Sequence, residues 1–379
     1  MDTDDFQPIP LLDLRAQHAS IREEVLAQVT RVIDAQAFIL GPDVERLEDL
    51  ARNYCRTRHA IGCASGSDAL YLALLALGIG HGDEVLTSPF TFFATAGAVV
   101  RAGARPVFVD IEPSTFNMDP SLVEGALLTH PSIKAIIPVH LYGAPADMDP
   151  IREVALRRGI AVIEDAAQSI GAEYKGRRCG TLGDVACFSF FPSKNLGGYG
   201  DAGLLTTNDD ALADRLRSLR VHGSTIKYYH HLVGINSRID ALQAAVLSVK
   251  FGHLDSWTAG RQRNAALYNQ RFHALGTPVT VPQPAPSTTR HVFNQFVIRA
   301  GERDALRGWL SSRRIATEIY YPLPLHLQEC FAYLGYKPGD LPVSEAAAAQ
   351  ALALPIFPEL PEDSLHRVAD SIDEFFRKG

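Results

Sequence analysis

Three short segments of the sequence carry side chains whose types suit one kind of chemistry. Lys194 lies in a loop between an apolar strand pattern and the glycine-rich stretch 197–200. Asp165 follows the apolar run 161–163, and Ser67 lies in a turn of small residues that opens into a helix. A helix start binds phosphate, an acid pairs with a protonated ring nitrogen, and a lysine amine attacks an aldehyde. Together these groups predict a site for pyridoxal 5'-phosphate (PLP).

A single lysine is usually a solvated surface group, but the setting of Lys194 argues against that interpretation. It follows a strand pattern that contains Phe188, Phe190 and Phe191, so its surroundings are predicted to be partly apolar. Removal from water lowers the pKa of a lysine amine and makes the amine a competent Schiff-base nucleophile. We therefore predict that Lys194 binds the cofactor aldehyde.

The position of Asp165 at a strand end has two common uses. Its carboxylate could cap the following helix, or it could pair with the protonated pyridine nitrogen and keep the ring electron-withdrawing. We favour the role at the cofactor. Gln168, three residues later, is predicted to lie on the same face, where its amide would bond the ring hydroxyl or cover the ring.

The phosphate end of the predicted site lies at Gly66, Ser67 and Asp68. Backbone N–H groups and a hydroxyl at a helix start bind phosphate, although the same residues also occur as a plain helix cap. Asp68 is negative and would repel phosphate unless its side chain points away, so we assign the contact mainly to the backbone and to Ser67. Ser189 is a candidate second hydroxyl donor, and one ring of the run Thr91-Phe92-Phe93 could stack on the pyridine or instead belong to the core.

The composition excludes several classes of partner. The chain has 379 residues and a formal net charge of −7 spread along its length, which argues against nucleic acid as a general partner. Its N-terminus is acidic where a signal peptide would be basic and then apolar, and no apolar run reaches membrane-spanning length. We therefore predict a cytoplasmic protein with no membrane partner.

Neither the cysteines nor the histidines are spaced as metal ligands. The five cysteines are scattered without a C-x-x-C pair, which favours free thiols in a reducing compartment. His140, His222 and His326 are equally scattered, so we predict no metal site. The glycine-rich stretch 78–82 follows a helix and is predicted to be a helix-ending turn rather than a nucleotide-binding loop.

The candidate residues must be positioned by alternating strands and helices. Strand patterns separated by helical patterns cover residues 84–87, 106–109, 135–139 and 161–163. This alternation predicts an α/β fold with a mostly parallel central sheet flanked by helices. Asp165 falls at the carboxyl end of such a strand, where ligands bind in these sheets. Shorter pieces, antiparallel in our interpretation, follow at 185–190 and 203–207.

A smaller C-terminal α/β domain is predicted to follow the first. A long helix that begins at Ser237 leads toward it, and the proline-rich segment 278–287 is interpreted as a connector. We predict a large PLP-binding domain with N-terminal helices at residues 1–255 and a small domain at residues 256–379.

The full set of motifs resembles the DegT/StrS-type sugar-nucleotide aminotransferases, which are fold-type I PLP enzymes. The similar stretches run in order from about Ile9 to the C-terminus, so the resemblance covers nearly the whole chain. They are Gly66-Ser67-Asp68-Ala69-Leu70, Asp165-Ala166-Ala167-Gln168, Phe191-Pro192-Ser193-Lys194, Gly234-Ile235-Asn236-Ser237-Arg238 and Asp240-Ala241-Leu242-Gln243-Ala244-Ala245.

The resemblance implies roles for the cofactor residues. Lys194 would be the Schiff-base lysine and the base that transfers the proton, with Asp165 on the pyridinium and Gln168 beside the ring hydroxyl. The remaining contacts in the same chain would come from Ser67 and Ser189 on the phosphate and from Phe92 on the ring.

The resemblance also implies a homodimer in which each active site borrows Asn236 from the partner chain. Tyr320, Tyr321 and His326 match a family region near the sugar nucleotide. Lys227 and Tyr228, together with His326, are predicted to hold the pyrophosphate of that substrate.

The predicted activity is the transfer of an amino group from an amino acid, L-glutamate, to a keto group on a nucleotide-linked hexose. The product would be an amino sugar for surface polysaccharide or lipopolysaccharide. The chain has glutamine at position 168 and the sequence Pro192-Ser193-Lys194 in the lysine loop. Both features resemble the family members that act at carbon 3 more than those that act at carbon 4. We therefore expect a 3-keto hexose linked to UDP, or alternatively to dTDP.

Other functions remain as alternatives. A 4-keto sugar nucleotide could be the acceptor. A related branch dehydrates sugars with histidine at the lysine position, and Lys194 counts against it. A cysteine desulfurase would need a mobile cysteine, for which Cys330 is the only candidate. A non-catalytic regulatory protein could bind PLP or a sugar nucleotide, but no DNA-binding helix pair or basic stripe is visible.

Overall fold

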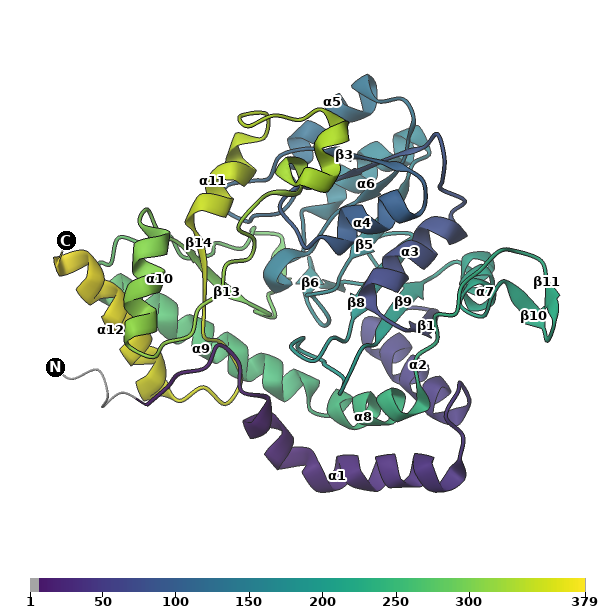
Figure 1. Cartoon of the computed structure of the whole chain (residues 1–379), viewed down its shortest axis with the longest axis horizontal. Helices are drawn as coiled ribbons and strands as arrows, with labels where there is room; N and C mark the ends of the chain where they lie inside the picture. Colours follow the sequence, from purple (N-terminus) through teal and green to yellow (C-terminus); the bar gives the residue numbers. More distant parts are fainter. Residues whose placement is uncertain (1–6, 379) are drawn as a thin grey trace.

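The computed structural model describes residues 7–378 and is organised around a seven-stranded sheet (Figure 1). The strand order is β1-β9-β8-β5-β4-β2-β3. Adjacent strands from β8 to β3 pair in parallel, while β9 runs antiparallel to both of its neighbours. The prediction of a mostly parallel sheet is confirmed.

The strands and helices have the following bounds. The strands are β1 (His59–Cys63), β2 (Glu84–Thr87), β3 (Arg105–Phe108), β4 (Ile133–Ile137), β5 (Ala161–Asp165), β6 (Glu173–Tyr174), β7 (Arg177–Arg178), β8 (Val185–Ser189), β9 (Gly203–Thr207), β10 (Ser224–Ile226), β11 (Tyr229–His230), β12 (Thr288–Arg290), β13 (Phe296–Arg299) and β14 (Ala351–Leu354). The helices are α1 (Leu14–Ala35), α2 (Pro42–Cys55), α3 (Gly66–Ala76), α4 (Ala94–Arg101), α5 (Pro120–Thr129), α6 (Met148–Arg158), α7 (Asp210–Leu219), α8 (Ala241–Phe251), α9 (Leu254–Leu275), α10 (Arg303–Ser312), α11 (Pro342–Gln350) and α12 (Glu362–Lys378). Short 3-10 helices lie at η2 (Leu141–Gly143), η3 (Leu325–Leu327) and η4 (Glu329–Leu334).

One strand direction differs from the expectation. The antiparallel prediction is confirmed for β9 but is wrong for β8, which pairs in parallel with β5. Between these two strands the chain makes a long excursion that includes the short strands β6 and β7, so it returns to the sheet in the original direction. A connection of this length permits a parallel crossover, whereas a tight hairpin would not.

The two faces of the sheet are covered by different helices. Helices α3, α4 and α7 pack on the face that contains Ile163, while α5 and α6 pack on the opposite face, which contains Val162. Helices α2 and α8 cover a further buried cluster that includes Phe188. Because side chains alternate along a strand, Asp165 shares its face with Ile163, and Glu164 shares its face with Val162.

A second apolar core lies in the C-terminal part of the chain. It is formed by residues of α9, α10, α12, β13 and β14, and Ile9 from the N-terminal segment packs into it. Residue 255, at the end of the predicted large domain, lies in the first turn of α9. The division into two domains at this point stays a prediction.

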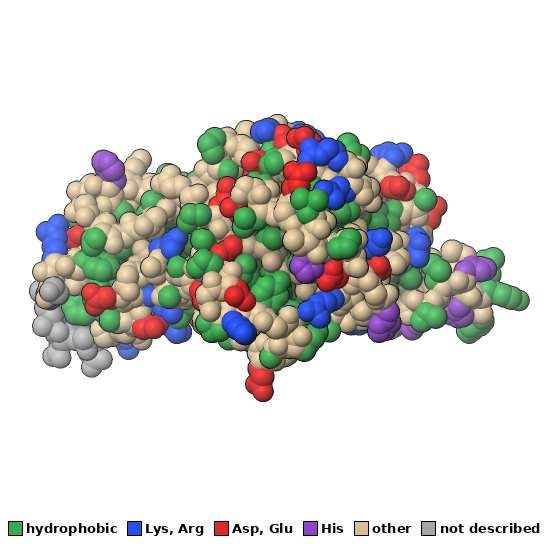
Figure 2. Space-filling model, turned by 90° about the horizontal axis from the view of Figure 1, so that it is seen from above, with side chains coloured by type: hydrophobic (Ala, Val, Ile, Leu, Met, Phe, Trp, Pro, Cys, Tyr) green, Lys and Arg blue, Asp and Glu red, His purple; other side chains and the backbone are tan. Residues whose placement is uncertain are grey.

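The hairpin formed by β10 and β11 projects from the body of the molecule (Figure 1). Figure 2 shows apolar and histidine side chains gathered at the projecting end. Tyr228, Tyr229 and Val233 of this segment are strongly exposed. None of the helices within residues 7–378 combines the length and the hydropathy that a membrane crossing requires.

Candidate active site

A cavity of about 440 Å³ opens at the carboxyl ends of β5 and β8, next to the first turn of α3. Most of the residues predicted from the sequence line this cavity. They are Gly66, Ser67, Phe92, Asp165, Gln168, Ser189, Lys194, Tyr320 and Tyr321. The structure thus brings together the lysine, the acid and the helix start, although they lie far apart in the sequence.

The N-terminus of α3 forms one end of the cavity. Ser65 caps the helix, and its hydroxyl accepts a hydrogen bond from the Asp68 N–H at 3.1 Å. The N–H groups of Gly66 and Ser67 occupy the first helical positions, which have no carbonyl partner within a helix. A Cβ at Gly66 would lie 2.6 Å from the Ser189 Cβ, so only glycine lets the two segments approach. The result is a cradle of N–H and hydroxyl groups suited to phosphate.

Asp68 does not direct its carboxylate into this cradle. The side chain accepts a hydrogen bond from Arg101 Nη1 at 2.8 Å and does not line the cavity. This orientation is the one that a phosphate contact through the backbone and Ser67 requires, and the contact itself stays a prediction. The physical reason for the orientation is the helix geometry, because the third helical position turns the side chain toward α4 and the solvent.

Asp165 presents a carboxylate that is almost completely buried. Its Oδ2 accepts a hydrogen bond from the Thr95 hydroxyl at 2.7 Å, and its Oδ1 accepts one from the Ala167 N–H at 3.2 Å. Burial raises the pKa of Asp165 above its usual value, and these bonds together with the nearby Lys194 oppose that rise. A cation bound against Asp165 would compensate the buried charge, as a protonated pyridine nitrogen does.

Lys194 lies in the loop that follows β8. Its backbone N–H donates to the Phe191 carbonyl at 2.8 Å. A Cβ at Gly197 would lie 2.3 Å from the Pro192 carbonyl oxygen, so glycine is required for this tight loop. Burial lowers the pKa of Lys194 from 10.5 to about 8, against the attraction of Asp165. A substantial fraction of the amine is therefore neutral, and nucleophilic, near pH 8.

Gln168 and two aromatic residues form another wall. The Gln168 Oε1 accepts the Tyr142 N–H at 2.6 Å, and its Nε2 donates to the Tyr321 hydroxyl at 3.3 Å. Phe92 is more than half exposed and its ring lies 6.2 Å from that of Tyr321. Gln168 therefore holds a fixed orientation, while Phe92 lies free to cover a ligand at the mouth.

Besides Asp68, four predicted residues do not line the cavity of their own chain. Asn236 lies in the segment between β11 and α8, and Lys227 and Tyr228 lie in the exposed hairpin. His326 is also outside the cavity: its side chain is completely buried, and its Nε2 is hydrogen-bonded to Glu345 at 3.2 Å. The role of His326 at the substrate stays a prediction, and its described side-chain contact is the one to Glu345.

Thr95 and Gln295 are among the lining or supporting residues that were not predicted from the sequence. Thr95, which bonds Asp165, lies in the first turn of α4, where a hydroxyl inside an apolar helix was the available signal. Gln295 lines the cavity from the segment before β13, more than a hundred residues from Lys194 in the chain. Its sequence neighbourhood carries no motif, so only the fold could place it.

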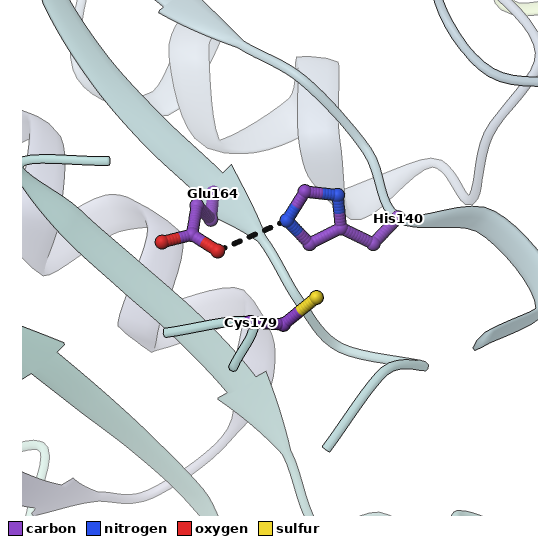
Figure 3. Close-up of side chains that lie close together, drawn as sticks. All are labelled: His140, Glu164 and Cys179. Atoms are coloured by element: carbon purple, nitrogen blue, oxygen red, sulfur yellow. Dashed lines mark hydrogen bonds and ion pairs between the residues drawn. The ribbon is translucent and has the colours of Figure 1, made fainter. Parts of the chain in front are cut away.

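The thiols play no part in this cavity. Cys330, the candidate for desulfurase chemistry, is exposed and does not line it, and all five cysteines are free. Cys179 lies close to His140 and Glu164 behind the sheet (Figure 3).

The cavity residues fit the predicted cofactor. The cradle at Gly66 and Ser67 suits a phosphate, the buried Asp165 carboxylate suits a protonated ring nitrogen, and the partly neutral Lys194 amine suits an aldehyde. Each of these three matches depends on a different physical feature, so their presence in one cavity supports PLP as the ligand.

Comparisons with known proteins identify a family for the chain. A family model described as the DegT/DnrJ/EryC1/StrS aminotransferase family matches residues 19–373. A "pleiotropic regulatory protein" of Geobacillus stearothermophilus is 54% identical over 97% of this chain and 99% of its own length. A UDP-N-acetyl-3-dehydro-alpha-D-glucosamine 3-aminotransferase of Acidithiobacillus ferrooxidans is 46% identical over 96% of this chain and 97% of its own length. The crystal structure of S. venezuelae DesV superposes with a TM-score of 0.94 at 46% identity, covering 97% of this chain and 98% of that one.

Proposed function

This chain belongs to the DegT/DnrJ/EryC1/StrS aminotransferase family, and we propose that it transfers an amino group from L-glutamate to the keto carbon of a nucleotide-linked hexose. It is a PLP-dependent aminotransferase of the fold-type I class. One observation carries the proposal. Lys194, Asp165 and the N-terminus of α3 converge on a single cavity that is large enough for a cofactor and part of a substrate.

The chemistry divides between the cofactor and the chain. PLP supplies the aldehyde carbon that takes and returns the amino group, and a ring that withdraws electrons from the reacting carbon. The negative charge of Asp165 would stabilise the protonated form of the ring nitrogen. Lys194 Nζ takes and returns the proton at the reacting carbon, for which a pKa near 8 is well matched to neutral or mildly alkaline conditions.

The proposed acceptor is a 3-keto hexose linked to UDP, with dTDP as the second choice and a 4-keto sugar as the alternative. The name of the A. ferrooxidans relative supports carbon 3 and UDP. Tyr320 and Tyr321 line the part of the cavity against which the hexose would lie, and Gln168 would lie beside the cofactor ring. Because the attacked carbon must lie over the reactive carbon of the cofactor, a shift of the keto group by one position rotates the whole hexose.

We predict that the reverse reaction distinguishes the two positions. The enzyme in its pyridoxal form is mixed with 3-amino and 4-amino UDP-hexoses, and the absorbance of bound PLP is followed in a stopped-flow instrument. The 3-amino sugar is expected to discharge the absorbance at least about tenfold faster, since a misplaced reacting carbon costs at least that much in rate. Faster conversion of the 4-amino sugar would overturn the assignment of carbon 3.

The regulatory alternative is separated by the first half of the reaction. The G. stearothermophilus relative carries a regulatory name, but the cavity of this chain holds a lysine and an acid in positions suited to catalysis. Glutamate is expected to abolish the absorbance of the bound PLP by transferring its amino group to the cofactor. A keto-sugar nucleotide is then expected to restore that absorbance by accepting the amino group. A chain that binds PLP and sugar nucleotides without exchanging amino groups would support the regulatory alternative instead.

We propose further that the enzyme is a homodimer with shared active sites. The β10–β11 hairpin and the residues that follow it expose apolar side chains: Tyr228 in the hairpin is 81% exposed and Val233 after it is 95% exposed, which favours contact with another protein surface. Asn236 follows this hairpin at the entry to α8, so it would reach the site of the partner subunit across a two-fold axis. In that arrangement Lys227 and Tyr228 would lie near the pyrophosphate of the partner's substrate.

Mixed dimers test this arrangement. Lys194→Ala and Asn236→Asp chains are each expected to be inactive alone. After subunit exchange, about half of the dimers are hybrids in which one of the two sites is intact, so about a quarter of the wild-type specific activity is expected to return. The control is a mixture of Lys194→Ala with itself under the same exchange conditions. If activity stays at the control level after exchange is verified by mass spectrometry, Asn236 does not act across the dimer.

The remaining proposals concern the cellular role. Free thiols at all five cysteines support a reducing compartment, so we propose the cytoplasm as the site of action. The amino sugar formed there would be used in surface polysaccharide or lipopolysaccharide.

A further inference from the structure

Behind the active-site face of the sheet lies a buried carboxylate that the proposed mechanism does not use. Glu164 precedes Asp165 in β5 and points to the opposite face, where it is completely buried. Its Oε1 accepts the N–H groups of Leu182 at 2.6 Å and Gly183 at 2.8 Å, and its Oε2 accepts the Gly180 N–H at 2.8 Å. A buried carboxylate is costly unless it is compensated, so this site is built for a charged Glu164.

The fourth bond to this carboxylate comes from a buried histidine (Figure 3). His140 Nε2 lies 3.0 Å from Glu164 Oε2. Its Nδ1 accepts the Ala146 N–H at 3.1 Å, so the ring proton is on Nε2 and is donated to Glu164. The His140 backbone N–H also donates to the Asp165 carbonyl, and the Asp165 N–H donates to the Pro138 carbonyl, both at 3.0 Å. The His140 side chain and the backbone of residues 138–140 thus connect the segment after β4 to the end of β5, where Asp165 lies.

A metal site is the competing interpretation of this cluster. Cys179 lies beside the pair, and one ligand atom from each of the three residues falls within 4.8 Å of the others. The two Glu164 oxygens already accept four hydrogen bonds, which fills their lone-pair directions. The Glu164 oxygens are therefore already occupied by hydrogen bonds, and we assign no metal to this cluster.

We propose that the Glu164–His140 hydrogen bond positions Asp165 and so sets how tightly the chain binds PLP. The inference rests on the proposed PLP-dependent function, because it acts through the ring nitrogen that Asp165 is assigned to bind. Consecutive side chains in a strand are joined by one planar peptide, so a movement of Glu164 is transmitted to Asp165. A displacement of about 1 Å is enough to weaken a charge-assisted hydrogen bond substantially.

Three substitutions of His140 separate its contacts. Glutamine reaches Glu164 with an amide N–H and keeps the proposed bond. Asparagine is shorter, so it can still accept the Ala146 N–H but cannot reach Glu164; leucine is made as well, because either of the disruptive variants could fail to fold. Thermal denaturation of the apo chains identifies which ones are folded, and the dissociation constant for PLP is then measured by absorbance titration.

The expected result is a rise of about tenfold in the PLP dissociation constant for His140→Asn or His140→Leu, the equivalent of one hydrogen bond. His140→Gln is expected to stay within about threefold of wild type. The matched control is His130→Leu, which removes a histidine–glutamate contact to Glu84 at the amino end of β2, away from the carboxyl ends where the cavity opens, and is expected to leave PLP affinity unchanged. An equal loss in the control would mean that general destabilisation explains the result.

A double-mutant cycle tests whether the effect passes through Asp165. In a chain that already carries Asp165→Asn, the added His140 substitution is expected to weaken PLP binding less than about twofold. The same tenfold loss in both backgrounds, or no loss in either, would overturn the proposal. PLP binding involves no sugar, so failure to find a sugar substrate would contradict the proposed acceptor and leave this measurement unaffected.

Discussion

Replacement of Lys194 by alanine is expected to abolish transamination while leaving a folded chain that still binds PLP non-covalently. Lys194 is the lysine that lines the cavity in the described part of the chain, and burial gives its amine a pKa of about 8. Its removal eliminates both the nucleophile and the group that moves the proton. We expect the rate of the glutamate half-reaction to fall by at least about 10³-fold, since proton transfer by a positioned side chain alone contributes about 10²–10⁴-fold.

Covalent trapping provides the direct test of this residue. Borohydride reduction of the wild-type enzyme followed by peptide mass analysis is expected to place a pyridoxyl group on Lys194. Lys250 is a demanding control, because burial also lowers its pKa to about 8, yet its Nζ donates to the Gly197 carbonyl at 2.5 Å and does not line the cavity. Recovery of the label on Lys250, Lys175 or Lys227 would contradict the assignment.

The sequence predicts those parts of the fold in which apolar residues recur with the regular spacing of a strand or a helix. The strand and helix pattern from residue 84 to residue 163 is recovered in β2 to β5, because apolar alternation with helical segments leaves few other folds. The predicted direction of β8 relative to β5 was wrong, because the direction of a strand depends on the path of the segment that leads to it. In this segment the short strands β6 and β7 have little sequence pattern from which that path could be predicted.

The same distinction holds within the site. Lys194 and Asp165 could be expected to line one cavity because Lys194 follows an apolar strand and Asp165 ends one, and the carboxyl ends of parallel strands meet on one side of the sheet. The partners of Asp68 and His326 were not predicted: the Asp68 side chain bonds Arg101, and the His326 ring bonds Glu345. Which way a polar side chain points depends on partners distant in the sequence, so residue type alone could not predict these contacts.

Supporting residues are the least visible in a single sequence. Thr95 and His140 each act on Asp165 or its strand from other elements, and neither belongs to a motif that specifies chemistry. Their roles depend on the register between neighbouring strands and helices. The structure was therefore needed to connect them with the acid.

Asp165→Asn is expected to produce the second large loss, in the cofactor's affinity and in the rate of the glutamate half-reaction together. The buried carboxylate of Asp165 has a raised pKa, and a protonated ring nitrogen would compensate its charge. Asparagine keeps the size but removes that charge, so the ring nitrogen loses its proton more readily. We expect PLP to bind about 10- to 100-fold more weakly, the value of a hydrogen bond between charged groups, and the half-reaction to slow by at least the same factor.

The comparison of Asp165→Asn with Thr95→Val separates the charge of the acid from its orientation. Thr95 donates to Asp165 Oδ2 at 2.7 Å, so valine removes one neutral hydrogen bond and keeps the carboxylate. We expect this variant to weaken PLP binding only about three- to tenfold, because a neutral bond contributes less than a charged one. Single-turnover rates at saturating PLP then show whether the ring proton itself matters. If Asp165→Asn matches wild type once PLP saturates the site, the acid would only anchor the cofactor and would not sustain its reactivity.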